Sequence, residues 1–249
     1  MITGASSGIG KATAWILAEH GYNLIVTGRR SARLNELKNL LEKQYNIKVL
    51  PLSFDIRDNN EVIRFINSLS PEWKKIDVLI NNAGLAAGLN PIHEGVLNNW
   101  ERMIDTNIKG LLYISRYVSK LMIENGSGHI VNISSIAGKE AYPNGNVYCA
   151  TKHAVEALTK SMRQDLLKYN IKVSSIAPGA VETEFSIVRF DGDEIKAGGV
   201  YEGYQPLQAK DIAETIHFII SRPAHVNIND VLVMPTAQAN ATMFNKKNE

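Results

Sequence analysis

The chain has 249 residues, of which 45% are hydrophobic and 21% charged, and its formal net charge is +2. This balance argues against a disordered chain, and charges of both signs are spread without the basic stripe of a nucleic-acid-binding protein. No apolar stretch approaches the roughly 18 residues of a membrane helix, and no signal-peptide pattern is present. The single cysteine, Cys149, cannot form an internal disulfide. We therefore expect a soluble, cytoplasmic protein with no nucleic-acid or membrane partner.

Short apolar runs alternate with amphipathic helical stretches along the chain. The expected strands are 23–27, 48–54, 78–80, 129–133, 172–177 and 231–233, and the expected helices are 12–20, 31–45, 59–69, 98–125, 146–169 and 208–221. Such alternation produces right-handed βαβ units and a parallel sheet. The sequence therefore predicts an α/β fold with a doubly wound, Rossmann-type parallel sheet, formed by a single domain over residues 1–249.

Two segments depart from this alternation. Met1 and Ile2 directly precede a glycine-rich turn, so the first strand, which belongs at the centre of such a sheet, has almost no residues. Either residues are missing before Met1 or this start was chosen wrongly. The second segment, 182–204, has the least regular pattern. Because ligands bind outside the carboxyl ends of the strands in open α/β sheets, we expect it to form a mobile substrate loop over the site.

Residues 3–10 read TGASSGIG, and a helical pattern follows at once. Glycines permit a tight turn and the close approach of a pyrophosphate, and a helix N-terminus offers unpaired N–H donors. The turn is thus a candidate dinucleotide site, although such turns also serve only to connect elements. The candidate cofactor-binding residues here are Gly4, Ser6, Ser7, Gly8, Ile9 and Gly10.

The next strand ends in TGRR at residues 27–30, with no carboxylate. An acidic residue near this point binds the ribose 2′-hydroxyl of NAD, whereas arginine accommodates the 2′-phosphate of NADP. Arg29 and Arg30 therefore predict NADP as cofactor, the alternative being a solvated pair at a helix start. Asp55, just past the following strand, is a candidate for a hydrogen bond to the adenine, or else caps the helix near residue 59.

Tyr148 and Lys152 stand four residues apart in a helical segment, so they share one face. A nearby ammonium lowers the pKa of a phenol, which makes Tyr148 a candidate catalytic acid/base and Lys152 the group that tunes it. Ser135 follows the strand at 129–133, at the sheet edge where ligands bind, and could steady a substrate carbonyl. Taken alone, the Tyr/Lys spacing is usually accidental, and Ser135 equally fits a turn that closes a strand.

Three further features point to the same edge. The sequence NNAG at 81–84 follows one strand, Asn107 lies inside an otherwise apolar helix, and Pro178-Gly179 follows another strand. Buried asparagines need hydrogen-bond partners, so each of these features could be purely structural.

The order and spacing of these motifs are similar to those of the short-chain dehydrogenase/reductase family, which the chain resembles over nearly its whole length. The resemblance implies Tyr148 as proton donor, Lys152 on the nicotinamide ribose and Ser135 on the carbonyl oxygen. It also implies that Asn107 maintains a water link to Lys152 for proton relay. Further cofactor contacts are implied for Asn81, Ala83, Gly84, Pro178, Gly179, Val181 and Thr183.

Residues 178–193, 222–229 and 234–236 resemble the NADP-dependent 3-hydroxy acid dehydrogenases of this family. This implies substrates such as serine, allo-threonine and 3-hydroxypropionate or malonic semialdehyde, and a homotetramer packed through 98–125 and 146–169. A buried substrate carboxylate needs a partner, for which Arg189 is the candidate. The alternative is that Arg189 is solvated or pairs with Asp191 or Asp193.

Other functions remain open from the sequence. The chain could reduce other small ketones or aldehydes, or it could be a catalytically silent nucleotide-binding protein. A sugar-nucleotide epimerase shares the Tyr/Lys pair, but it usually has another glycine spacing and an added substrate domain. The six histidines show no metal-site spacing and no cysteine company, so we expect no metal.

Overall fold

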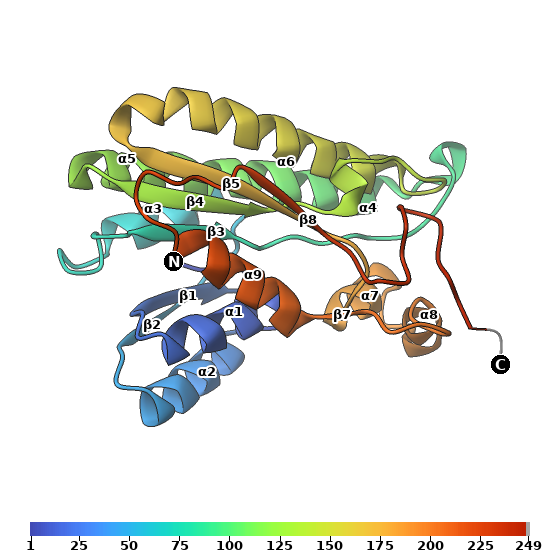
Figure 1. Cartoon of the computed structure of the whole chain (residues 1–249), viewed down its shortest axis with the longest axis horizontal. Helices are drawn as coiled ribbons and strands as arrows, with labels where there is room; N and C mark the ends of the chain where they lie inside the picture. The colour runs from blue at the N-terminus through green and yellow to red at the C-terminus, as the bar shows by residue number, and fades with distance from the viewer. Residues whose placement is uncertain (248–249) are drawn as a thin grey trace.

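Parallel strands form the centre of the computed structural model, which describes residues 1–247 (Figure 1). β1 pairs with β2, and β3, β4, β5 and β8 follow one another in a second run, every neighbouring pair being parallel. A short parallel pair, β6 with β7, lies apart. The strands are β1 Leu24–Gly28, β2 Val49–Ser53, β3 Val78–Asn81, β4 Gly128–Ile133, β5 Ile171–Pro178, β6 Val181–Glu182, β7 Leu207–Gln208 and β8 Asp230–Val233.

The first residues of the chain join the two runs of strands. Ile2 forms parallel bridges to Val26 on one side and to Ile80 on the other. Its N–H donates to Ile25 O at 2.8 Å and its carbonyl accepts from Thr27 N at 2.9 Å. Met1 to Thr3 therefore occupy the central position predicted for the first strand, although they are too few to form a strand of their own.

Helices cover both faces of the sheet, as Figure 1 shows, and this confirms the predicted α/β fold. α1, α2 and α9 lie on one face, where apolar side chains such as Leu17 and Ile216 pack against β1 and β5. α3, α4, α5 and α6 lie on the other, where Val118 and Met122 pack against Ile130. The bounds are α1 Gly8–Glu19, α2 Ser31–Gln44, α3 Asn59–Asn67, α4 Leu97–Ile104, α5 Leu111–Asn125, α6 Asn146–Asp165 and α9 Ala209–Ile220.

The helix expected over 98–125 is interrupted. One widened turn, a π-helix over Asp105–Gly110, separates α4 from α5. A side chain at Gly110 would come within 2.9 Å of Ile56, so the backbone approaches the segment after β2 closely there. Such π-turns occur frequently at functional sites. Asn107 lies within this one.

The segment 182–204 is more regular than expected. It contains α7, Glu184–Arg189, and α8, Glu194–Gly199. Thr183 caps α7 by accepting a hydrogen bond from Phe185 N at 3.2 Å, and Asp193 caps α8 in the same way from Lys196 N at 3.0 Å. Side-chain caps stabilise these two short helices on either side of the turn at Gly192, so the expected loop is partly helical, and its mobility stays a prediction.

Within residues 1–247, the helices are all too short or too polar to cross a membrane. In the same range, His, Cys, Asp and Glu side chains form no group of three or more that could hold a metal ion.

Candidate active site

A cavity of about 750 Å³ opens at the carboxyl ends of the strands. Segments that are far apart in the sequence meet there, among them the turns after β1, β2, β3, β4 and β5. Of the residues predicted for the site, it is lined by Gly4, Ser6, Ser7, Gly8, Ile9, Arg29, Arg30, Asp55, Ala83, Gly84, Ser135, Tyr148, Lys152, Pro178, Gly179, Val181, Thr183 and Arg189. Gly10, Asn81 and Asn107 lie behind its wall.

The glycine-rich turn has the geometry expected of a phosphate site. Gly4 and Gly8 adopt positive φ angles of 66° and 51°, a region that glycine enters at little cost. Ser7 precedes α1 but its side chain makes no capping hydrogen bond, so the first N–H groups of the helix are left for another acceptor. Because Gly8 and Ile9 line the cavity, the turn fits a pyrophosphate at a helix N-terminus.

Gly10 shapes this turn from behind. A Cβ atom there would lie 2.5 Å from both Gly4 O and Asn82 Nδ2. Asn82 in turn donates from Nδ2 to Thr3 O at 2.9 Å, which ties the turn to the end of β3. The close packing of these backbones excludes any side chain at residue 10.

A Gly10→Ala variant should therefore lose cofactor affinity and unfold at a lower temperature. Overpacking of this kind costs about 1–3 kcal/mol, and displacement of the turn would disturb the phosphate site. Gly198→Ala is the matched control, because a Cβ there meets nothing within 4 Å. Thermal unfolding with and without NADPH measures both effects. Equal melting of the two variants would contradict the role given to Gly10.

Cationic donors gather at the end of β1. Arg30 donates from Nε to Ser6 Oγ at 3.0 Å and from Nη2 to Ser7 Oγ at 2.6 Å, and Arg29 lines the cavity beside it. Two guanidiniums and two hydroxyls at this place fit a 2′-phosphate. The one carboxylate bound to them, that of Glu184, comes from α7 on the other side of the cleft.

Asp55 also lies at the cavity, at the adenine end of the predicted cofactor path. It is bound through both oxygens by Arg57, with Nη2 to Oδ2 at 2.6 Å and Nε to Oδ1 at 3.0 Å. It does not cap α3, because Asp58 accepts from Asn60 N at 2.8 Å in that position. The alternative role for Asp55 is thus removed, and its contact with adenine stays a prediction.

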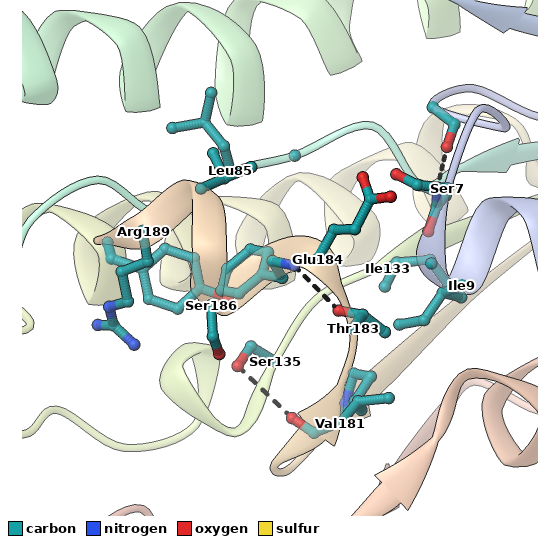
Figure 2. Close-up of a pocket in the computed structure, with 18 of the residues that line it drawn as sticks. Ser7, Ile9, Leu85, Ile133, Ser135, Val181, Thr183, Glu184, Ser186 and Arg189 are labelled. Carbon is teal, nitrogen blue, oxygen red and sulfur yellow. Dashed lines mark hydrogen bonds between the residues drawn. The ribbon is translucent and has the colours of Figure 1, made fainter. Parts of the chain in front are cut away.

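Ser135, Tyr148 and Lys152 meet at the other end of the cavity. Ser135 lies directly after β4, where its Oγ accepts from Ala137 N at 3.1 Å and is 3.5 Å from Pro178 O (Figure 2). Tyr148 is buried in the first turn of α6, and Lys152 lies one turn further on. Lys152 Nζ donates to Ile133 O at 2.9 Å and lies 5.9 Å from the centroid of the Tyr148 ring.

The electrostatics of Tyr148 differ from the sequence-based expectation. Burial raises the pKa of Tyr148 above its ordinary value, and the hydrogen bond with Ser135 and the charge of Arg189 only partly oppose this. Burial also disfavours the charged form of Lys152 and lowers its pKa to about 8, although the negative charge of Glu156 acts in the opposite direction. Lys152 Nζ donates to the Ile133 carbonyl here, and the lowering of the phenol pKa by Lys152 stays a prediction for the cofactor-bound protein. Tyr148 is therefore protonated at neutral pH, as a proton donor must be.

Asn107 and Asn81 are held by protein partners. Asn107 donates to Leu85 O at 2.8 Å and to Thr151 Oγ1 at 3.0 Å, and accepts from Leu85 N at 2.9 Å. A Cβ at Gly84 would lie 3.2 Å from Asn107 Oδ1 and 3.5 Å from Lys152 Nζ, so only Gly84 separates the two side chains. The water link from Asn107 to Lys152 stays a prediction.

Asn81 points away from the cavity. Its Nδ2 donates to Ser115 Oγ and Asn132 Oδ1, both at 2.8 Å, beneath the cavity wall. The structure does not bring this side chain to the predicted cofactor path, and only its backbone could reach the cofactor. The neighbouring Asn82, by contrast, lines the cavity.

Arg189, at the end of α7, reaches the catalytic end of the cavity. Its Nη2 donates to Tyr142 OH at 2.9 Å, and its guanidinium carbon lies 5.5 Å from the centroid of the Tyr148 ring. Its Nε is buried and has no hydrogen-bond partner among residues 1–247. The proposed alternative partners are engaged elsewhere or too distant: Asp193 pairs with Lys196, and Asp191 has Arg102 as its nearest cation, at 3.9 Å. An unpaired cationic donor thus remains for an anion beside Tyr148.

Several lining residues were not predicted from the sequence. Tyr142 comes from the loop between β4 and α6, and no local motif distinguishes it. Gln238, which accepts from Ala180 N at 2.8 Å, leads a C-terminal stretch along the cavity. The other polar or aromatic lining residues that were not predicted for the site are Thr27, Phe54, Asn82, Thr106, Ser134, Glu184, Phe185, Ser186, Phe190, Tyr201, Thr242, Phe244 and Lys246. Of these, only Asn82 had a signal, the NNAG sequence.

Comparisons with known proteins agree with this geometry. A family model described as short chain dehydrogenase matches residues 1–193. An NADP-dependent 3-hydroxy acid dehydrogenase of Salmonella typhi is 45% identical over 240 residues, 96% of this chain and 95% of that protein. Sulfoacetaldehyde reductase 2 of Chromohalobacter salexigens is 43% identical over 240 residues, 96% of this chain and 94% of that protein. The closed form of serine dehydrogenase complexed with NADP+ matches with a TM-score of 0.92 at 42% identity, covering 99% of this chain and 98% of that chain.

Proposed function

This chain belongs to the short-chain dehydrogenase family, and we propose that it is an NADP-dependent oxidoreductase of short hydroxy acids that carry an anionic group. The observation that carries the proposal is the buried, unpartnered Nε of Arg189 beside Tyr148. Burying a substrate anion without a partner costs free energy. A guanidinium offsets this cost because it can donate two parallel hydrogen bonds to the anion. The names of two relatives, a 3-hydroxy acid dehydrogenase and a sulfoacetaldehyde reductase, both describe short compounds with an acidic group.

Each residue of the site has a separate role in the proposed reaction. NADP(H), when bound, supplies or accepts the hydride. Ser135 Oγ holds the oxygen of the carbonyl or hydroxyl group, and Tyr148 OH gives that oxygen its proton in reduction and takes it back in oxidation. Lys152 binds the nicotinamide ribose, and its charge then also acts on Tyr148. Arg189 holds the acidic group, while Phe185 and Tyr142 exclude water around it.

An Arg189→Met variant tests the anchor. We expect the KM for 3-hydroxypropionate or serine to rise by about one to two decades, the value of a charged hydrogen bond. Reduction of neutral aldehydes of similar size should change little. Arg64→Met, on the exposed surface of α3, controls for the lost charge. Equal loss on both substrate classes would show that Arg189 serves the structure of α7, and unchanged kinetics would remove it from the site.

Two other functions have less support. A reductase of neutral ketones or aldehydes needs no cation beside Tyr148, and the substrate panel above separates it from the proposal. A nucleotide-binding protein without catalysis would have no use for Ser135, Tyr148 and Lys152 in one cavity. Oxidation of NADPH in the presence of a 3-oxo acid or aldehyde would exclude it.

We also propose that the protein is a cytoplasmic homotetramer. Its single cysteine is buried in α6, which suits a reducing compartment. Ile104 and Leu112, at the junction of α4 and α5, are more than a third exposed, at 38% and 37%. These helices and α6 are the expected packing surfaces. Light scattering coupled to size-exclusion chromatography would give the mass, and a monomer would refute the assembly.

A further inference from the structure

An ion pair crosses the mouth of the cofactor cleft. Glu184, the first residue of α7, accepts from Arg30 Nη1 at 2.8 Å and from Arg33 Nη1 at 2.7 Å. Arg30 precedes α2 and Arg33 lies in its first turn, so the pair joins the start of α2 to α7 beside the cavity that Arg30 and Glu184 line. In Figure 2 the Glu184 side chain extends toward Ser7, whereas Arg189 lies at the far end of the same helix.

The contact lies at the predicted 2′-phosphate site, so it can affect cofactor binding as well as the fold. Arg30 also donates hydrogen bonds to the hydroxyl groups of Ser6 and Ser7 in the glycine-rich turn. The same guanidinium is the predicted partner of the 2′-phosphate. One of its edges is thus already occupied by an anion that belongs to the chain. The hydrogen bond from Arg30 keeps the pKa of Glu184 below its usual range, so this anion is present at neutral pH.

We propose that Glu184 occupies part of the 2′-phosphate site and is displaced by NADP(H), which makes it a specificity-determining residue for the cofactor. The inference rests on the use of NADP(H) proposed above. A phosphate dianion competes with the carboxylate for Arg30 and repels it. NADH has no phosphate at this position, so it can bind with the ion pair intact. The carboxylate therefore opposes the binding of NADP(H) alone.

The ion pairs of Glu184 with Arg30 and Arg33 are weak enough for a phosphate to displace the carboxylate. The side chains of Arg30, Arg33 and Glu184 are 42%, 47% and 43% exposed, and exposed pairs of this kind contribute little to stability because water and salt screen them. A phosphate with two charges and three acceptor oxygens can replace such a contact. When it does, the N-terminal end of α7 is released, while Arg189 at the other end stays with Tyr142.

The test is a Glu184→Gln variant, which keeps the shape and removes the charge. We expect NADPH to bind about two- to tenfold more tightly, the equivalent of one or two exposed ion pairs, and NADH to bind as before. Adenosine 2′,5′-bisphosphate should gain by the same factor, since it has the phosphate but no nicotinamide. Fluorescence titration measures the two cofactors, and calorimetry measures the bisphosphate.

Two controls make the outcome decisive. Glu194→Gln removes the same charge from the exposed start of α8 and should change no affinity. Glu184→Ala should act in the same direction as Glu184→Gln. Weaker or unchanged NADPH binding in both Glu184 variants would overturn the proposal, as would an equal gain for NADH. A wild-type protein that binds neither NADPH nor the bisphosphate would instead refute the use of NADP(H).

Discussion

A Tyr148→Phe variant should lose about 10²–10⁴ in turnover, the usual contribution of a general acid/base group. The substitution removes the hydroxyl that gives the substrate oxygen its proton but leaves the ring in its buried position against Phe185, whose centroid is 5.7 Å away. NADPH should still bind, because the predicted phosphate contacts lie at the opposite end of the cavity. Stopped-flow oxidation of NADPH measures the loss, and fluorescence titration checks the binding.

The matched control for Tyr148 is Tyr117→Phe on α5, where the lost hydroxyl is 3.3 Å from Asn59 Oδ1 and far from the cavity. It should keep full activity. Turnover near that of the wild type in Tyr148→Phe would show that another group supplies the proton. A loss of both turnover and NADPH binding would show that the hydroxyl maintains the cavity and does not act only as a proton donor.

The second large effect concerns the cofactor. A double variant, Arg29→Gln with Arg30→Gln, should bind NADPH about one to two decades more weakly, since each charge-assisted contact contributes roughly 1.5–3 kcal/mol. The affinity for NADH should stay the same or rise slightly, so the ratio of the NADPH affinity to the NADH affinity should fall or reverse. Titration of both cofactors gives the ratio directly.

A control for net charge is the double variant Lys43→Gln with Arg64→Gln, on the exposed surfaces of α2 and α3. It should leave both affinities unchanged. If the wild type bound NADPH and NADH equally, the interpretation of the TGRR sequence would be wrong. An equal loss for both cofactors in the Arg29/Arg30 variant would instead place these arginines against a phosphate that both share.

The sequence was sufficient wherever the signal is local. The alternation of apolar runs predicted the parallel sheet and its helices, because strand and helix periodicities arise within a few residues. The spacing of four residues placed Tyr148 and Lys152 on one face of α6, and the glycines at 4 and 8 indicated the turn before α1. The carboxyl ends of parallel strands meet at one edge, so Ser135 and Pro178 could be assigned to the same site.

Only the tertiary structure determined which side chains face one another. Arg189 meets Tyr142 across 47 residues and Glu184 meets Arg30 across 154, and no periodicity links residues so far apart. Asn81 and Asn82 are neighbours in a motif, yet only Asn82 lines the cavity, because successive side chains of a strand point to opposite faces.

The burial of Tyr148 is likewise a property of the packed molecule. The sequence indicated a phenol near an ammonium and so a lowered pKa, but the enclosed cavity raises it. Desolvation depends on every segment that surrounds a group, whereas helix spacing depends on one segment alone. The sequence by itself therefore determined the fold and the family, and it placed the predicted catalytic pair on one helix face. Packing between distant segments determined the direction in which the pKa values of that pair shift, the position of Arg189 and the anion that lies across the predicted cofactor site.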